Sequence, residues 1–235
     1  FGHPRGLVVL FLAEMRERFS YYGMRALLVL YLTWHFLFER DFSLTLYGAY
    51  VALVYLGPLL GGYLADKYIG ARKAVLFGAI LLVGGHALMG FHGAPARETL
   101  QAGGVSYEFQ RAAYDEAEQR QILIEGEAVA VTGFRQPEAG SPIRIVTFER
   151  NGAVETLEGT IVRERDPLYE QILFAALALI VAGVGFLKGN ISACVGALYA
   201  EGARRRDAGF TIYYMGINLG AFASSLVCAW LAAAY

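Results

Sequence analysis

The chain has 235 residues, of which 56% are hydrophobic and 17% charged, and its formal net charge is −1. Soluble domains carry about 25% charged residues, so this composition favours a membrane protein, and the near-neutral balance gives no reason to expect nucleic-acid binding. Cys194 and Cys228 both lie in apolar segments and indicate neither a disulfide framework nor a zinc site. The first apolar run is too long and too charged for a cleavable signal peptide.

Five apolar segments are each long enough to cross a bilayer, which takes about 20 helical residues. We therefore predict an α-helical membrane protein with five spanning helices. The first segment exceeds the required length, and we expect it to tilt or to project beyond the bilayer. The segments lie near Leu7–Phe38, Leu46–Leu64, Ala74–Phe91, Ile172–Ala200 and Phe210–Tyr235.

Basic residues in the short loops predict the orientation of these helices, because cytoplasmic loops are enriched in lysine and arginine. Arg5 precedes the first segment, and the run 204–206 of three arginines lies between the fourth and the fifth. Lys67, Arg72 and Lys73 lie between the second and the third. All of these fall on one side. We therefore expect a multi-pass protein of the plasma membrane or bacterial inner membrane with a cytoplasmic N-terminus.

Residues 93–167 form an insertion between the third and fourth segments, which makes them extracytoplasmic in this topology. The insertion holds 8 arginines and 13 acidic residues, a net charge of −5 against +4 for the remainder of the chain. We expect a helix over 97–121, although Gly103 and Gly104 weaken that prediction. From Ile122 onward the residues alternate in strand fashion, and Asn151-Gly152 is a strong hairpin signal. The insertion is thus predicted to be a small α+β module with an unknown partner.

A charged stripe interrupts the first apolar segment. A charge at the centre of a membrane costs roughly 2.5–3.5 kcal/mol on insertion scales, so such groups usually face a polar cavity and have a function. At about 100° per residue, one helical face holds six polar residues within side-chain reach of one another, whereas Arg16 points away. The six are Glu14, Glu17, Arg18, Tyr21, Tyr22 and Arg25.

The segment Glu14-Met-Arg-Glu-Arg-Phe-Ser-Tyr-Tyr-Gly23 resembles the ExxERFxYYG motif on the first helix of the proton-dependent oligopeptide transporters, the POT family of the major facilitator superfamily. Three later segments match motifs of the family or superfamily in the expected order. The family's fourth-helix motif reads Lys-Pro-Asn, whereas Gly189 stands in place of the proline here, and either residue weakens a helix. The three segments are Gly61–Lys73, Gly185–Ser192 and Phe210–Phe222.

The resemblance implies a proton-coupled symporter that imports di- and tripeptides by alternating access. It implies no enzyme activity, no cofactor and no metal. The residues expected to couple protons are Glu14, Glu17, Arg18 and Lys188. The residues expected to form a cytoplasmic gating latch are Asp66, Arg72 and Lys73. The residues expected to contact substrate are Tyr21, Tyr22, Arg25, Tyr55, Lys188 and Asn218.

Charge gives this assignment a physical basis, because cations outnumber carboxylates at membrane depth. The resemblance assigns a peptide's C-terminal carboxylate to Arg25, with Lys188 nearby. Burial favours the neutral form of a carboxylate, and a nearby cation favours its ionised form. A bound substrate carboxylate would compete for Arg18 or Lys188, so peptide binding and proton binding at Glu14 or Glu17 would be linked reciprocally.

The resemblance covers everything except the insertion, but only the first half of the family's fold. Family members have at least twelve spanning helices in two six-helix halves. We therefore expect the chain to be part of a longer transporter, with the missing half, the lipid bilayer, protons and short peptides as its partners. The expected divisions are helices one to three in 1–92, the insertion in 93–167, and helices four and five in 168–235.

Two other functions fit the sequence. The surplus of positive charge also suits a transporter of nitrate or another small anion, although the paired tyrosines and Asn218 favour a larger ligand. Alternatively, the insertion is a receptor or docking module held by a helical anchor, but an anchor needs neither the charged stripe nor Lys188. His86, in the third segment, has no acidic neighbour in the sequence, and we expect it to be packed rather than to carry protons.

Overall fold

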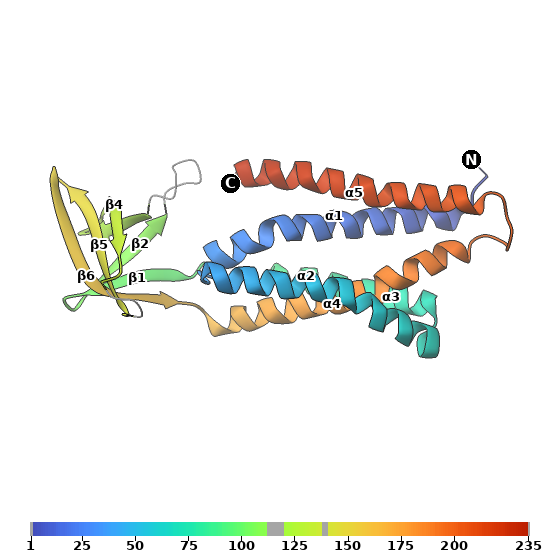
Figure 1. Cartoon of the computed structure of the whole chain (residues 1–235), viewed down its shortest axis with the longest axis horizontal. Coiled ribbons are helices and arrows are strands. Elements are labelled where there is room, and N and C mark those ends of the chain that lie inside the picture. Colours follow the sequence, from blue (N-terminus) through green and yellow to red (C-terminus); the bar gives the residue numbers. More distant parts are fainter. Residues whose placement is uncertain (1, 112–119, 138–140, 235) are drawn as a thin grey trace. The chain divides into compact units, whose positions relative to one another are not determined.

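The computed structural model of the chain describes residues 2–111, 120–137 and 141–234, and these divide into two compact units. The described part of the first unit, here called the helical unit, comprises residues 2–34, 38–93 and 167–234. The second, called the barrel unit, comprises residues 35–37 and 94–166 apart from the two internal gaps. Figure 1 shows the long helices in the first and the strands in the second.

Each of the five apolar segments forms a helix, as predicted. Proline at the first position of α4 suits a helix start, since its missing N–H needs no partner there. Gly70, with φ of 79°, separates a short π-helical turn η1 from α3. The elements are α1 (Arg5–Trp34), α2 (Arg40–Leu64), η1 (Ala65–Ile69), α3 (Ala71–Met89), α4 (Pro167–Gly196) and α5 (Arg206–Ala234).

Four helical segments of the described chain are long and apolar enough to cross a membrane. Although α1 has 30 residues, it is not one of these four, and it differs from them in carrying six charged residues. Its crossing of the membrane stays a prediction. The four segments are Arg40–Ile69, Ala71–Met89, Pro167–Gly196 and Arg206–Leu231.

The helices lie lengthwise beside one another, with α5 against α1 and with α2 and α3 against α4 (Figure 1). Glycines allow the close crossings, as their GxxxG spacing predicts. A Cβ atom on Gly61 of α2 would collide with the carbonyl oxygen of Gly185 in α4. Gly220 of α5 faces the carbonyl oxygen of Met15 in α1 in the same way. The buried Asn190 adds a hydrogen bond at the α2–α4 crossing, where its Nδ2 donates to the Gly61 carbonyl at 3.4 Å.

The insertion folds into a closed antiparallel barrel in which each strand pairs with the next and β6 returns to β1. The alternating pattern predicted for its second half is confirmed, because Val129 is buried and Val131 packs against the same core. The strands are β1 (Arg97–Ala102), β2 (Val105–Arg111), β3 (Arg120–Ile124), β4 (Glu127–Arg135), β5 (Ile143–Arg150) and β6 (Ala153–Glu164).

Within the described residues, three two-residue turns join consecutive strands of the barrel. Asn151-Gly152 joins β5 to β6, as predicted, and both residues have positive φ. Gly103-Gly104 joins β1 to β2, and Glu125-Gly126 joins β3 to β4, again with positive φ throughout. Such turns match the twist of paired strands. Since the strands alternate in direction, all three turns lie at one end of the barrel, called the turn end.

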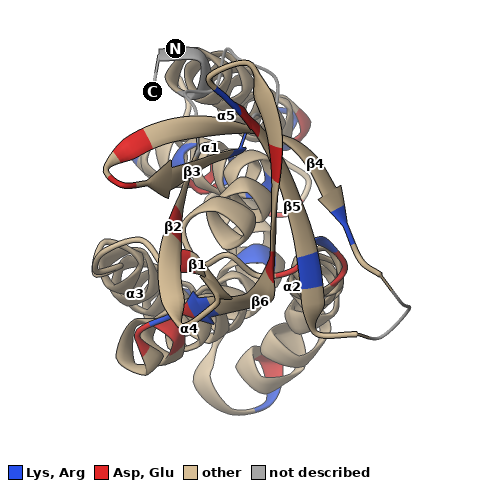
Figure 2. Cartoon of the chain, turned by 90° about the vertical axis from the view of Figure 1, so that its left-hand side faces the viewer, with Lys and Arg blue, Asp and Glu red and all other residues tan. Residues whose placement is uncertain are grey.

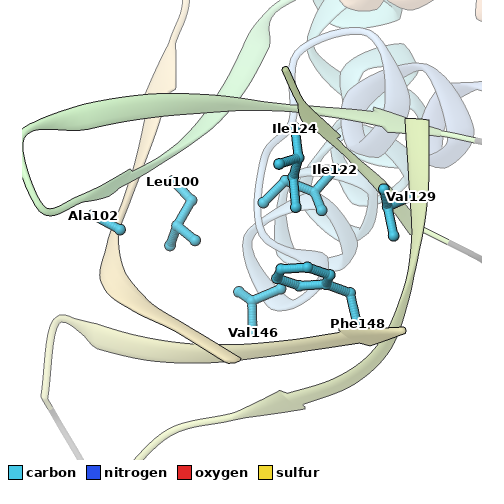
Figure 3. Packing of buried hydrophobic residues seen from close by; sticks show 7 residues of the cluster. All are labelled: Leu100, Ala102, Ile122, Ile124, Val129, Val146 and Phe148. Atoms are coloured by element: carbon cyan, nitrogen blue, oxygen red, sulfur yellow. The ribbon is translucent and has the colours of Figure 1, made fainter. Parts of the chain in front are cut away.

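Inward-facing apolar side chains fill the barrel (Figure 3). They recur at every second residue of a strand, as the two-residue period of β-structure requires. Leu100, Ile122 and Val146 are fully buried, and they come from β1, β3 and β5. The complete set of buried core residues is Leu100, Ala102, Ile122, Ile124, Val129, Val146 and Phe148.

The predicted helix over 97–121 is wrong wherever the structure describes that range, so the described part of the insertion is all-β rather than α+β. Residues 97–102 and 105–111 are strands, and residues 112–119 lie outside the described residues. The physical reason is the Gly103-Gly104 pair, which forms a hairpin turn instead of merely weakening a helix. The burial of Leu100 and Ala102, two residues apart, follows a strand period and not a helical one.

Candidate functional site

The charged stripe of α1 forms a buried ion cluster inside the helical unit. Glu14, Glu17 and Arg18 are 1%, 7% and 6% exposed. Arg18 Nε lies 2.7 Å from Glu14 Oε1 and 3.0 Å from Glu17 Oε2. One guanidinium thus faces two carboxylates, which is the arrangement that buried charges need, because an unpaired ion is strongly disfavoured away from water.

The two glutamates differ in how their oxygens are used. The Tyr213 hydroxyl of α5 donates to Glu14 Oε2 at 2.8 Å, so both oxygens of Glu14 are engaged. Glu17 has the ion pair with Arg18, but within the described residues neither of its buried oxygens accepts a geometrically sound hydrogen bond. Glu17 is therefore the carboxylate with acceptor capacity left for a proton or a water molecule.

Lys188 of α4 lies beside the aromatic residues of α1 and α2. Its Nζ is 4.5 Å from the centre of the Tyr55 ring and 5.6 Å from that of Tyr21. Cation–π contacts at such distances stabilise a lysine whose charge is partly removed from water. Tyr21 and Tyr55 also meet edge to face, with ring centres 6.4 Å apart. The structure therefore brings together three residues that sequence reasoning assigned to one site.

Arg25 lies further along α1 in an exposed position. Its Nε donates to the Tyr47 hydroxyl of α2 at 2.7 Å. Tyr22 packs edge-on against Tyr21, with ring centres 5.2 Å apart. Asn218 is exposed on α5, where its Nδ2 donates to the Tyr214 carbonyl one turn back at 3.3 Å. Arg25 and Asn218 thus reach the helix surface rather than the buried ion cluster.

The predicted gating residues lie around η1. Asp66, Arg72 and Lys73 are all exposed. Among the described residues no ion pair joins Asp66 to Arg72, so the latch is not closed between these two side chains. Lys67, next to Asp66, instead donates to the Tyr63 hydroxyl at 3.1 Å.

A second polar group lies between α1 and α3. His86 was expected to be packed, but it is exposed on α3, and its partner Ser20 was not predicted from the sequence. His86 Nε2 and Ser20 Oγ are hydrogen-bonded, and His86 Nδ1 is 2.7 Å from the Leu82 carbonyl oxygen. A cleft of about 390 Å³ is lined by His86 together with Arg16 and Glu17. Although His86 has no acidic neighbour in sequence, folding therefore places it on the same cleft as Glu17.

Tyr213 and Tyr47 are the other contacts that sequence reasoning did not assign. Tyr213 stands 199 residues from Glu14, and Tyr47 stands 22 residues from Arg25. A tyrosine in an apolar segment gives no sign of its partner, although Tyr213 belongs to the motif on α5. Only the packing of α5 on α1 and of α2 on α1 brings these hydroxyls to the charged stripe.

The fold and the buried cluster together define a class of protein. A multi-pass helical bundle that buries an ion cluster close to a lysine and several tyrosines is characteristic of membrane transporters. The sequence model of the POT family matches residues 72–235. The chain belongs to the POT family, whose members are transporters and not enzymes.

Characterised relatives and solved structures agree with this assignment. The chain is 30% identical to the peptide transporter YePEPT of Yersinia enterocolitica, over 98% of the chain and 32% of the relative. It is 31% identical to the di-/tripeptide transporter of Lactococcus lactis, over 97% of the chain and 32% of the relative. The chain thus spans about a third of the length of the curated relatives it matches.

Two solved structures share the fold. A peptide transporter of the POT family in complex with sulfate superposes with a TM-score of 0.62 at 32% identity, covering 97% of this chain and 32% of that one. A POT family transporter in complex with 5-aminolevulinic acid gives a TM-score of 0.61 at 29% identity, covering 99% and 33%. The superpositions support a helical membrane-transporter fold for this chain.

Proposed function

We propose that this chain is the N-terminal membrane portion of a proton-coupled symporter that imports di- and tripeptides by alternating access. The observation that carries the proposal is the buried cluster of Arg18 with Glu14 and Glu17, next to Lys188 on its tyrosine rings. The relatives named as peptide transporters support the substrate class. In this proposal α1 crosses the membrane with the other four helices.

The peptide carboxylate is the part of the substrate that this half recognises. Arg25 is exposed, and its guanidinium retains donors beyond the one bonded to Tyr47. Lys188, held against Tyr55, supplies a second cation. Tyr21, Tyr22 and Asn218 supply rings and an amide for the peptide's side chains and backbone.

Glu17 carries the coupled proton in this mechanism, and Glu14 holds Arg18 in place. In this proposal the ion pair with Arg18 supports the charged form of Glu17, and Lys188 is the second cation of the site. A substrate carboxylate that attracts either cation weakens that support and favours protonation of Glu17. By linkage, protonation of Glu17 releases a cation for the substrate. Binding of peptide and proton is thereby cooperative.

Orientation and gating complete the proposal. The basic loops lie on the cytoplasmic side with the N-terminus, and the barrel unit lies on the extracytoplasmic side. The sequence around η1 provides an acid, Asp66, and two cations, Arg72 and Lys73, that form ion pairs in one state of the transport cycle and separate in another. Their exposure leaves them accessible to partners elsewhere in the complete transporter.

Uptake by the complete transporter in proteoliposomes tests the function. An imposed inward proton gradient should drive accumulation of a labelled dipeptide, and dissipating the gradient should abolish it. Accumulation of labelled nitrate under the same gradient, without dipeptide uptake, would point to a small-anion transporter. If neither compound is accumulated by correctly folded protein, the transport proposal fails, and the role of a docking module becomes the better account.

A further inference from the structure

The barrel unit has a charged layer at one end of its interior, next to the apolar core. Glu98 on β1 precedes the buried Leu100 by two residues, and Arg120 on β3 precedes Ile122 in the same way, so these side chains share the inward face. Arg144 on β5 stands in the same relation to Val146. These positions lie at the end where the chain enters and leaves the barrel, opposite the turn end.

The carboxylate in this layer is already paired. Glu98 is 5% exposed, and its Oε1 accepts a hydrogen bond from Arg163 Nε at 2.9 Å. Arg163 and Glu98 are also direct cross-strand neighbours in the β1–β6 ladder. Arg120 approaches the other oxygen of Glu98 only to 3.7 Å. Within the described residues, the single negative charge of Glu98 is thus shared between Arg163 and Arg120.

Arg144 and Arg120 are positioned by uncharged groups. Within the described residues, Arg144 makes two hydrogen bonds, in which its Nη1 donates to the carbonyl oxygens of Ser141 and Ile143. Its Nε and Nη2 donors remain for a ligand. The Arg120 guanidinium lies 5.1 Å from the centre of the Phe134 ring. A ring contact of this kind orients a guanidinium without neutralising it.

The three arginines surround an open cleft of about 520 Å³. Val131 and Phe134 form an apolar wall, and a β-bulge between Val131 and Gly133 shifts the register there. The volume falls within the range of small-ligand sites, roughly 300–1,000 Å³. The strands carry acidic as well as basic residues (Figure 2). The sequence of the insertion has a net charge of −5, so a cleft lined by three arginines differs from its overall acidic character.

We propose that Arg120, Arg144 and Arg163 form a binding site for a phosphate group at this end of the barrel, with Phe134 and Val131 contacting a small apolar or planar substituent. The guanidinium fork matches the oxygens of a phosphate in pairs. A phosphate monoester carries about −1.5 to −2 charges at neutral pH, which suits the surplus of positive charge that the three arginines have over Glu98 among the described residues. This site is separate from the transport cluster and does not depend on the proposed transport function.

Calorimetric titration of the complete transporter in a neutral detergent with inorganic phosphate tests the site, at constant ionic strength and against sulfate-free chloride buffer. We expect saturable binding at one site per chain. Arg144→Gln and Arg120→Gln should each weaken it roughly tenfold or more, since each removes charge-assisted hydrogen bonds. Binding that is absent, or equal in both variants and the parent chain, would overturn the proposal, as would equally tight binding of acetate.

Two further variants separate a specific site from general electrostatics. Arg150→Gln is a matched control on the same strand, because Arg150 lies at the turn end, where its Nη2 donates to Glu125 at 2.7 Å. That hydrogen bond holds the pKa of the Glu125 carboxyl below its usual value, and its loss should leave phosphate affinity unchanged. Glu98→Gln should strengthen phosphate binding several-fold, because it removes the carboxylate that competes with phosphate for Arg163 and Arg120. Weaker binding in a folded Glu98→Gln variant would contradict the charge assignment.

The phosphate has two chemical sources, free in solution or on a lipid headgroup. Nanodiscs of phosphatidylcholine with and without phosphatidate distinguish them. Competition of phosphatidate with inorganic phosphate, lost in Arg144→Gln, would identify a lipid headgroup as a ligand of the site. Binding of inorganic phosphate that phosphatidate does not affect would identify a soluble phosphate compound. In both cases the dependence on Arg144 carries the inference.

Discussion

Within the charged stripe of α1, the two glutamates have different surroundings, and that difference separates their expected roles. Glu14 is bonded by Arg18 on one oxygen and by Tyr213 on the other. Glu17 shares Arg18 but has no further hydrogen-bond partner among the described residues. Both oxygens of Glu14 are therefore engaged, whereas Glu17 keeps acceptor capacity for a proton. Glu14 is accordingly expected to position Arg18, and Glu17 to exchange the proton.

The Tyr213 hydroxyl should matter for stability. Tyr213→Phe leaves a buried oxygen of Glu14 without its donor, which costs about 1–3 kcal/mol. We expect a lower midpoint of thermal unfolding in detergent. Tyr214→Phe is the control, since Tyr214 is the adjacent tyrosine and is 51% exposed. Equal midpoints for the two variants would show that the Tyr213–Glu14 hydrogen bond does not stabilise the bundle.

Arg25 should recognise the carboxylate of the peptide. In the complete transporter, Arg25→Ala should weaken binding of peptides with a free C-terminus by about 1.5–3 kcal/mol, the value of a charge-assisted hydrogen bond. Amidated peptides should lose much less, which competition assays against a labelled dipeptide measure. Arg5→Ala serves as the control, because Arg5 is also exposed on α1 but lies at its first residue, away from the stripe. Equal losses for free and amidated peptides would exclude Arg25 as the carboxylate partner.

At the scale of whole elements, the crossing of α2 and α4 fixes the position of Lys188 relative to Tyr55. Both residues lie on helices that meet at Gly61 and Gly185 with almost no room for side chains. Small residues at such crossings allow the two backbones to approach closely. The glycines are therefore structural, while their close approach brings a cation of one helix to the aromatic ring of the other.

Adjacent glycines of α2 give a direct test of this crossing. Gly61→Ala introduces a methyl group that collides with the Gly185 backbone. Overpacking of this kind lowers the free energy of unfolding by about 1–3 kcal/mol. Gly62→Ala meets no atom within 4 Å, and alanine is the better helix former by about 1 kcal/mol. We expect Gly61→Ala to lower the unfolding midpoint and Gly62→Ala to leave it unchanged or raise it. The reverse order would contradict the crossing geometry.

Sequence patterns predicted the long helices and one hairpin correctly, but they wrongly predicted a helix in the first part of the insertion. The apolar segments and the Asn151-Gly152 hairpin were predicted because length and turn chemistry are local properties. The Gly103-Gly104 turn was misinterpreted, because two glycines within a mixed polar stretch fit either a weak helix or a tight hairpin. Glu125-Gly126 was not recognised, since glutamate with φ of 53° is unusual at a turn. The pairing of β1 with β6 favours the hairpin over the helix for residues 97–111. That pairing joins residues far apart in the sequence, so local patterns do not reveal it.

The same limit applies to the candidate site. The stripe of α1 follows from helical periodicity, so its shared face was predictable from residues 14–25 alone. The contacts of Lys188 with Tyr55, and of Tyr213 with Glu14, join helices far apart in sequence. The resemblance to the family had placed Lys188 and Tyr55 in one substrate site, but their contact was not predicted. The second contact was not anticipated, because nothing in the sequence indicates where a buried tyrosine donates.

At the scale of the whole molecule, residues 94–166 of the barrel unit form a continuous insertion between two helices that pack on each other. α3 ends at Met89 and α4 begins at Pro167, and the two are in extensive contact. Replacing residues 94–166 with a short polar linker should therefore leave the complete transporter folded, with unchanged proton-driven dipeptide uptake in proteoliposomes. A well-folded variant without transport would make the barrel part of the transport mechanism.

The central claim is that Glu17 couples proton movement to peptide movement, and Glu17→Gln in the complete transporter tests it most directly. Two measurements on the same proteoliposomes are needed. One is accumulation of a labelled dipeptide under an inward proton gradient, and the other is exchange of labelled for unlabelled dipeptide without a gradient. The account predicts that accumulation is lost while exchange persists, because the amide preserves the shape of the site but cannot bind and release the proton. Gradient-driven accumulation that persists in Glu17→Gln would contradict the account.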